Sequence, residues 1–168
     1  PALDSLKIAQ RREQEITHRH ILSYSQSWES LPSFFDLAII ATNANVREAV
    51  TIRLLENCKV RFLILEKVMF QDLGAYERVA QHLVKKNVIT YVNHPRRMFE
   101  SYKAINKVLF PKVNGLYSVV GGNWGLGCNA LHFLDLFVYL SGKKVRDINV
   151  DSVDNELVES ARKGFFEF

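Results

Sequence analysis

The sequence predicts an α/β protein built on a parallel sheet. Three short apolar runs are separated by two segments with helical spacing, and these runs lie at Asp36–Thr42, Val60–Leu65 and Val88–Val92. Each run is apolar at most of its consecutive positions, which is typical of a strand that is buried on both faces. Strands that alternate with helices favour a parallel sheet with right-handed crossover connections.

The segments around these strands have the apolar spacing of helices. Val46–Asn57 follows a polar turn at residues 43–45, which can cap a helix. Asp72–Lys86 places a set of apolar residues on one helical face, namely Leu73, Tyr76, Val79, Ala80 and Leu83. We also expect an amphipathic helix within residues 3–15 and another helix that ends at about Leu109.

The last third of the sequence has a different pattern. A glycine-rich stretch at residues 121–127 leads into a strongly apolar helix over Cys128–Leu140. Runs rich in β-branched residues predict strands at Leu116–Val120 and Lys143–Val150. We therefore place a domain boundary near residue 108.

The composition excludes several classes of protein. Lys and Arg total 22 against 18 Asp and Glu, and the net charge of +4 is spread along the chain, so we expect no nucleic-acid partner. No apolar run reaches the ~18 residues that a membrane span needs, so we expect no membrane partner. Cys58 and Cys128 suggest neither a disulfide framework nor a metal site, and with no signal peptide the expected location is the cytoplasm. Because the sequence begins at Pro1 and ends within an apolar run, we expect it to be part of a longer protein.

Polar residues follow all three predicted strands. They are Thr42–Asn43, Glu66–Lys67 and Asn93–Arg97. Ligands of parallel sheets bind beyond the carboxyl ends of the strands, so we expect a binding site here. Lys67 could donate to a substrate oxygen at this edge, and the alternative is an ordinary solvated strand end.

A polar stripe crosses the otherwise apolar helix of the last third. It consists of Cys128, Asn129, His132 and Asp135, in which His132 lies three residues from Asn129 and Asp135 and four residues from Cys128. A histidine in such a stripe can take a hydroxyl proton while a neighbouring amine or amide orients the same oxygen. The alternative is a core histidine whose hydrogen bonds are satisfied inside the protein.

Two further motifs each have two interpretations. Gly125, Gly127 and Ala130 have the spacing of a dinucleotide-binding turn. However, the residues Gly121 to Gly125 intervene between the preceding strand and the second glycine, which favours a loop that approaches a ligand. Arg96 and Arg97 could hold a phosphate or carboxylate, and the alternative is a solvated basic face.

Four segments in register resemble the glucose–fructose oxidoreductase/inositol dehydrogenase/MocA (Gfo/Idh/MocA) family. Asp36–Thr42 resembles its strand ending in Ala-Thr, and Leu65–Lys67 resembles its Glu-Lys-Pro motif. Val92–Arg97 resembles the following strand and Arg-Arg turn, and Asn129–Leu136 resembles the helix with the pattern Asn/Gly-x-x-His-x-x-Asp-Leu. The resemblance extends over roughly residues 36–142.

The resemblance implies a fold and an activity. Residues 1–108 would be a partial dinucleotide-binding (Rossmann) domain without its first βαβ unit. Residues 109–168 would begin a substrate and oligomerisation domain with an open, mostly antiparallel sheet. The family implies an oxidoreductase that uses NAD or NADP on a hydroxyl of a sugar or sugar derivative, in carbohydrate biosynthesis. The exposed face of an open sheet predicts a homodimer or larger assembly.

The resemblance also implies residue roles. Lys67 and His132 would be the catalytic pair, with His132 exchanging a proton with the substrate hydroxyl. The cofactor would be held by Thr42, Asn43, Glu66 and Lys67. Substrate contacts would come from Asn93, Arg97, Trp124 and Asn129.

The sequence departs from the family pattern at several positions. Val68 stands where proline is usual, which predicts the loss of a rigid kink, and Cys128 stands where many members have aspartate. Arg47 stands where histidine is common, and no glycine-rich phosphate-binding turn precedes the first strand. We therefore expect this chain to be inactive alone. The alternative function is a non-catalytic binding or assembly module on a degenerate dehydrogenase fold.

Overall fold

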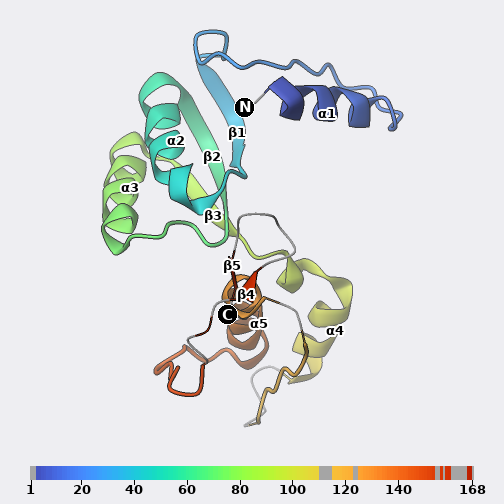
Figure 1. Cartoon of the computed structure of the whole chain (residues 1–168), viewed down its shortest axis with the longest axis vertical. Coiled ribbons are helices and arrows are strands. Elements are labelled where there is room, and N and C mark those ends of the chain that lie inside the picture. Colours follow the sequence, from blue (N-terminus) through green and yellow to red (C-terminus); the bar gives the residue numbers. More distant parts are fainter. Residues whose placement is uncertain are drawn as a thin grey trace.

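The computed structural model describes residues 3–109, 115–122, 125–153, 156, 158–159 and 166–167. Figure 1 shows an upper part built on a sheet and a lower part built on helices. The upper part contains α1 (Leu3–Glu13), β1 (Phe34–Ile40), α2 (Ala44–Asn57), β2 (Lys59–Glu66), α3 (Leu73–Lys86) and β3 (Ile89–Asn93). The lower part contains the 3-10 turn η1 (Pro95–Met98), α4 (Glu100–Leu109), α5 (Leu126–Ser141), β4 (Val158–Glu159) and β5 (Phe166–Glu167).

The sheet of the upper part is parallel, with its strands in the order β1-β2-β3. In this register, Leu37 of β1 lies beside Phe62 of β2, which lies beside Ile89 of β3. Helices α2 and α3 contact each other and lie on the same side of the sheet (Figure 1). The predicted α/β fold and parallel sheet are confirmed, and the strand ends differ from the predicted ones by one or two residues.

Local interactions explain where the helices begin and end. The carboxylate of Asp72 accepts hydrogen bonds from the backbone nitrogens of Gly74 and Ala75 at 3.2 and 3.1 Å, which starts α3. Helix α3 stops at Asn87, which has a left-handed φ of 52°. Helix α5 stops at Gly142, where φ is 66°, a conformation that glycine adopts without steric cost.

The core lies between the sheet and the two helices. Leu63 and Leu65 of β2 pack with Leu55 of α2 and Val79 of α3, and all four are fully or almost fully buried. Burying such a side chain contributes roughly 1.5–3 kcal/mol. This cluster fixes the strands whose carboxyl ends carry the candidate site.

The opposite face of the sheet is apolar and uncovered by the described residues. Leu37, Ile39 and Tyr91 are 50%, 62% and 58% exposed. The prediction that these strands are buried on both faces is therefore wrong for the described chain. The reason is that both crossover helices pack on one side, and no described element packs on the other.

The described strands of the lower part are not the ones that the sequence predicts. Residues 116–120 and 143–150 have no regular secondary structure, so both strand predictions are wrong. A strand needs a partner for its backbone hydrogen bonds, and none of the described residues pairs with either segment. The antiparallel pair is β4 with β5, two residues on each side. The expected boundary near residue 108 falls at the end of α4 and stays a prediction.

None of the described helices is long and apolar enough to cross a membrane. The described residues also contain no group of His, Cys, Asp and Glu that could hold a metal ion.

Candidate functional site

The candidate site lies where the carboxyl ends of β2 and β3 meet helix α5. Glu66 ends β2 and Asn93 ends β3, and the two residues are paired in the sheet register. The side-chain amide of Asn93 donates a hydrogen bond to Oε1 of Glu66. This contact fixes the direction of the carboxylate at the sheet edge, beside the next residue of the chain, Lys67.

Lys67 connects the sheet to α5. Its Nζ donates a hydrogen bond to the backbone carbonyl of Cys128, 2.9 Å away. Cys128 is in the first turn of α5 and His132 is one turn further along. The structure thus brings Lys67 and His132 into one site, although 65 positions separate them in the sequence, and their catalytic roles stay predictions.

His132 lies in an environment that favours its neutral form. Burial, followed by the positive charges of Lys67, Arg96 and His94, lowers the pKa of His132 below its ordinary value, while Glu66 opposes this effect. The ring of His94 meets the ring of His132 edge to face, with 5.6 Å between centroids. Nδ1 of each histidine is buried without a hydrogen-bond partner among the described residues. A neutral imidazole of this kind is ready to accept a proton.

The two adjacent arginines of η1 have different partners. Arg97 forms a two-pronged ion pair with Asp135 of α5, in which Nε donates to Oδ2 at 2.9 Å and Nη2 donates to Oδ1. Arg96 instead stacks on the ring of Phe133, 3.9 Å from its centroid, and its Nη2 lies 3.5 Å from Oδ1 of Asn129. The ion pair of Arg97 holds η1 against α5. Of the two arginines of η1, Arg96 has no carboxylate partner among the described residues.

Arg47 connects the loop after β1 with the loop after β2. It is only 3% exposed, and its guanidinium donates to backbone carbonyls of two loops, those of Thr42, Glu66, Val68 and Met69. Burial lowers the pKa of Arg47. The peptide bond between Lys67 and Val68 is cis. The sequence showed Arg47 only as a departure from a family pattern, and its partners are backbone atoms, which leave no sequence signal.

The residues after β1 lie at the same edge of the sheet. Oγ1 of Thr42 is buried and has no hydrogen-bond partner among the described residues. Asn43 is the N-cap of α2, as the polar turn predicts, but its side chain makes no capping hydrogen bond. Both residues lie at the carboxyl end of β1, and their roles in cofactor binding stay predictions.

Other sequence-predicted features lie outside this arrangement. Trp124, the fourth candidate substrate contact, is not among the described residues. Gly125 caps α5 with a φ of 61°, and a Cβ at Gly127 would meet nothing within 4 Å. The glycine pattern thus begins a helix that follows no described strand, whereas a dinucleotide turn directly follows a strand.

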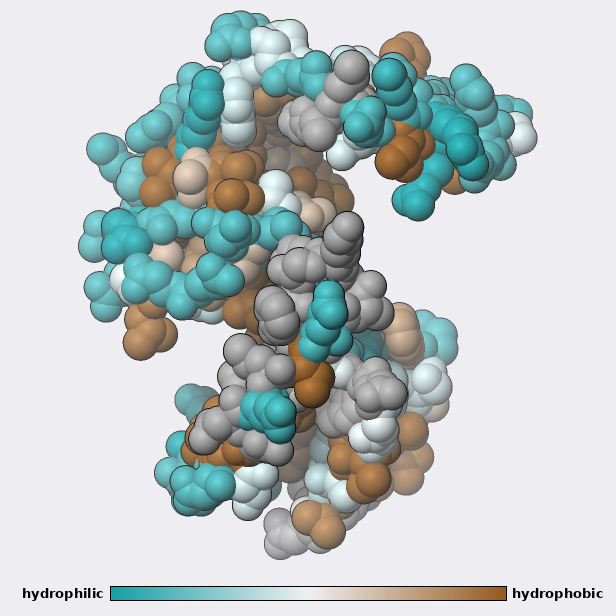
Figure 2. Space-filling view, viewed as in Figure 1, coloured by the Kyte–Doolittle hydropathy of each residue, from teal (hydrophilic) through white to brown (hydrophobic). Residues whose placement is uncertain are grey.

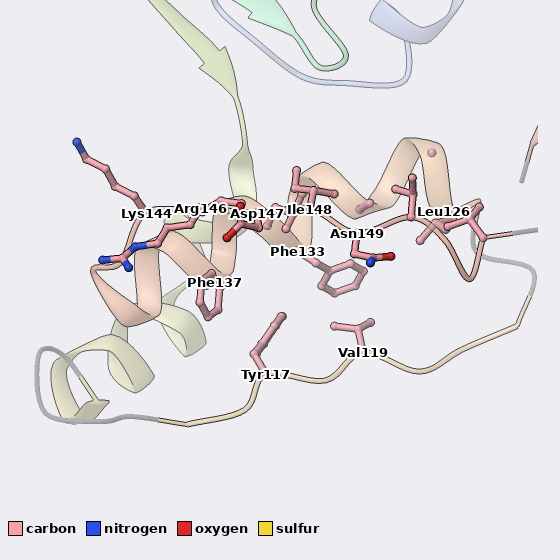
Figure 3. Close-up of a pocket in the computed structure, with 16 residues that line it drawn as sticks. Tyr117, Val119, Leu126, Phe133, Phe137, Lys144, Arg146, Asp147, Ile148 and Asn149 are labelled. Carbon is pink, nitrogen blue, oxygen red and sulfur yellow. The ribbon is translucent and has the colours of Figure 1, made fainter.

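A groove of about 1080 Å³ lies along another side of α5. Figure 3 shows Phe133 and Phe137 pointing from α5 toward Tyr117 and Val119 of the facing segment. Lys67 and His132 do not line this groove. Its lining is mostly apolar and also includes Tyr117, Lys144, Arg146, Asp147 and Asn149. We place the chemistry at the sheet edge because Lys67 and the helical turn of His132 meet there.

No protein-family model and no curated protein matches this chain. Solved structures match it. A protein from Klebsiella pneumoniae assigned to the oxidoreductases has a TM-score of 0.59 at 16% identity, over 80% of this chain and 40% of that one. The myo-inositol 2-dehydrogenase from Lactobacillus plantarum has a TM-score of 0.51 at 14% identity, over 70% and 41%. The dehydrogenase MviM from Clostridium difficile has a TM-score of 0.50 at 21% identity, over 66% and 39%.

At these identities the likeness concerns the fold. The chain has a partial Rossmann-like fold. It spans about two fifths of the length of these three structures. Its structural neighbours are dehydrogenases and oxidoreductases, which agrees with the fold that the strand pattern predicts.

Proposed function

We propose that this chain forms part of the active site of an NAD(P)-dependent oxidoreductase of the Gfo/Idh/MocA type, acting on a hydroxyl of a sugar or sugar derivative in cytoplasmic carbohydrate biosynthesis. The observation that carries the proposal is the meeting of Lys67 with the helical turn of His132, through the 2.9 Å bond to the Cys128 carbonyl. The fold shared with oxidoreductases and the four family-like segments support it.

The two residues have complementary chemistry. The ammonium of Lys67 donates a hydrogen bond to the substrate oxygen and stabilises negative charge that develops on it. His132, held neutral by burial and by neighbouring cations, accepts the hydroxyl proton. The positive charge of Lys67 both orients the substrate oxygen and keeps His132 unprotonated before the reaction.

A bound NAD or NADP would supply the acceptor or donor of the hydride. Of this chain's residues, those at the carboxyl ends of β1 and β2 fit the nicotinamide side of such a cofactor. The buried Oγ1 of Thr42 has no described partner, Asn43 is exposed, and Glu66 presents a carboxylate fixed by Asn93. A glycine-rich phosphate turn is not found before β1 in this sequence, so binding of the diphosphate is assigned to no residue of this chain.

The catalytic assignment is tested in the complete protein by two substitutions with matched controls. Lys67→Met and His132→Ala should each lower kcat by about 10²-fold or more, because each removes a group that acts on the reacting hydroxyl. Lys85→Met and His82→Ala, which make the same changes on α3 away from the site, should retain normal turnover. Near-normal kcat in both site variants would refute the assignment.

The rival function is a non-catalytic binding or assembly module. The observation that favours it is the exposed Cys128, which stands where many family members carry aspartate. Titration of the complete protein with NADH, followed by its fluorescence, separates the two functions. Saturable binding supports the enzyme, and no binding supports the module.

We also propose that the protein assembles as a homodimer or larger oligomer through apolar surface of its lower part. Val108, Leu116 and Val120 are exposed, and Figure 2 shows hydrophobic side chains gathered in this region. Static light scattering should give at least twice the monomer mass, and a monomer at high concentration would contradict the proposal.

A further inference from the structure

The candidate site holds more positive than negative charge. Lys67 and Arg96 are cations close enough to His132 to act on its charge, and Glu66 is the carboxylate that opposes them. The other carboxylate, Asp135, is neutralised by its ion pair with Arg97. Among the described residues, neither Lys67 nor Arg96 forms an ion pair with a carboxylate.

Arg96 is held in a fixed orientation. Its half-buried guanidinium lies over the ring of Phe133, with Cζ 3.9 Å from the ring centroid, and Nη2 reaches Oδ1 of Asn129 at 3.5 Å. The cation–π contact and the contact with Asn129 restrain the guanidinium, and these two contacts leave its other N–H groups available for a ligand. Arg97, in the same turn, shows what this local geometry binds, because it takes a carboxylate through two parallel hydrogen bonds.

We propose that Arg96 forms a subsite for an anionic substituent, a carboxylate or a phosphate, on the substrate whose hydroxyl lies between Lys67 and His132. This inference rests on the proposed function and narrows its substrate class to sugar acids or sugar phosphates. The anion would replace the carboxylate that Arg96 lacks and would offset the excess of cations around His132. Arg96 is then a specificity-determining residue, distinct from the catalytic pair.

The subsite predicts a measurable effect on His132. A bound anion adds negative charge near Arg96, so it should raise the pKa of His132 toward its ordinary value. The groups that face His132 are Lys67, Arg96 and His94, which lower its pKa, and Glu66, which raises it. Removing the charge of Arg96 should also raise this pKa, and an anion should then add no further increase.

The test is a histidine NMR titration of the chain with three probes at matched ionic strength. The probes are D-glucuronate, D-glucose 6-phosphate and neutral methyl glucoside, and His132→Asn assigns the signal. We expect at least one anionic probe to bind about tenfold more tightly than the glucoside, as one charge-assisted contact implies, and to raise the pKa of His132. Selectivity for glucuronate alone indicates a sugar acid, and selectivity for the phosphate alone indicates a sugar phosphate.

Matched variants separate the subsite from general attraction by a basic chain. Arg96→Gln should abolish both the preference and the pKa rise, whereas Lys85→Gln, which loses the same charge on exposed α3, should retain both. The subsite is overturned if neither anion is preferred, if Arg96→Gln keeps the preference, or if Lys85→Gln loses it. If the subsite is overturned, reduced turnover in Lys67→Met and His132→Ala would still support the proposed function. Conversely, an Arg96-dependent preference together with normal turnover in those two variants would support the subsite and refute the proposed function.

Discussion

The ammonium of Lys67 and the backbone carbonyl of Cys128 form a hydrogen bond of 2.9 Å between the carboxyl end of β2 and the first turn of α5. Because the acceptor is a backbone atom, the contact does not depend on which side chain stands at position 128. The replacement of an expected aspartate by cysteine therefore leaves the connection between the two parts of the site in place.

This relationship predicts different effects of two substitutions on the pKa of His132. Lys67→Met should raise the pKa of His132, because it removes a cation whose charge lowers that pKa, although burial should keep it below the ordinary value of 6.5. Cys128→Ala should leave the pKa unchanged, because the backbone carbonyl remains. Histidine NMR titrations of the wild-type chain and the two variants measure this, and an unchanged pKa in Lys67→Met would contradict the arrangement.

The lowered pKa of His132 also predicts how stability depends on pH. The unfolded chain binds a proton on this residue at a higher pH than the folded chain, so acidification favours unfolding. The stabilising contribution of neutral His132 should be fully present above about pH 6.5 and should be lost as the pH falls from there through the lower folded pKa. Urea denaturation between pH 5 and 8 should show a flatter pH dependence in His132→Asn than in the wild type. Equal slopes would show that His132 titrates normally in the folded chain.

The buried guanidinium of Arg47 predicts a large effect on stability. Arg47→Ala should lower the free energy of unfolding by about 3 kcal/mol, because several loop carbonyls would lose their donor while remaining buried. Arg61→Ala is the control, since Arg61 is exposed and its pair with Asp36 spans 3.8 Å, and it should cost less than about 1 kcal/mol. Urea denaturation compares the two, and similar losses would contradict a structural role for Arg47.

The sequence predicts the upper part of the fold better than the lower part for a physical reason. Each parallel strand there is a continuous apolar run whose partner follows one helix later, so local pattern and pairing agree. The strands expected at residues 116–120 and 143–150 depend on partners that no local pattern identifies, and those segments are irregular. A high strand propensity is therefore not sufficient to predict a strand when no partner strand can be identified.

The candidate site follows the same rule. The sequence identifies Lys67 because it follows the apolar run of a predicted strand. It identifies His132 because this residue lies in a polar stripe on an otherwise apolar helix. The distinction between Arg96 and Arg97 could not, because it depends on Asp135 and Phe133 of α5, more than 35 positions away. The sequence marks both arginines as candidates for anion binding, and only the structure shows that one of them is already paired.

The two faces of the sheet predict different sensitivities to truncation. Leu63 is 0% exposed against α2 and α3, so Leu63→Ala should lower the free energy of unfolding by about 2–5 kcal/mol through lost burial and a residual cavity. Leu37 is 50% exposed on the uncovered face, so Leu37→Ala should cost less than about 1 kcal/mol in the isolated chain, because little apolar surface returns to water. Urea denaturation of both variants measures the difference. An equally large loss for Leu37→Ala at every protein concentration would mean that this face is buried within the monomer, while a loss that grows with concentration would mean that a second copy covers it.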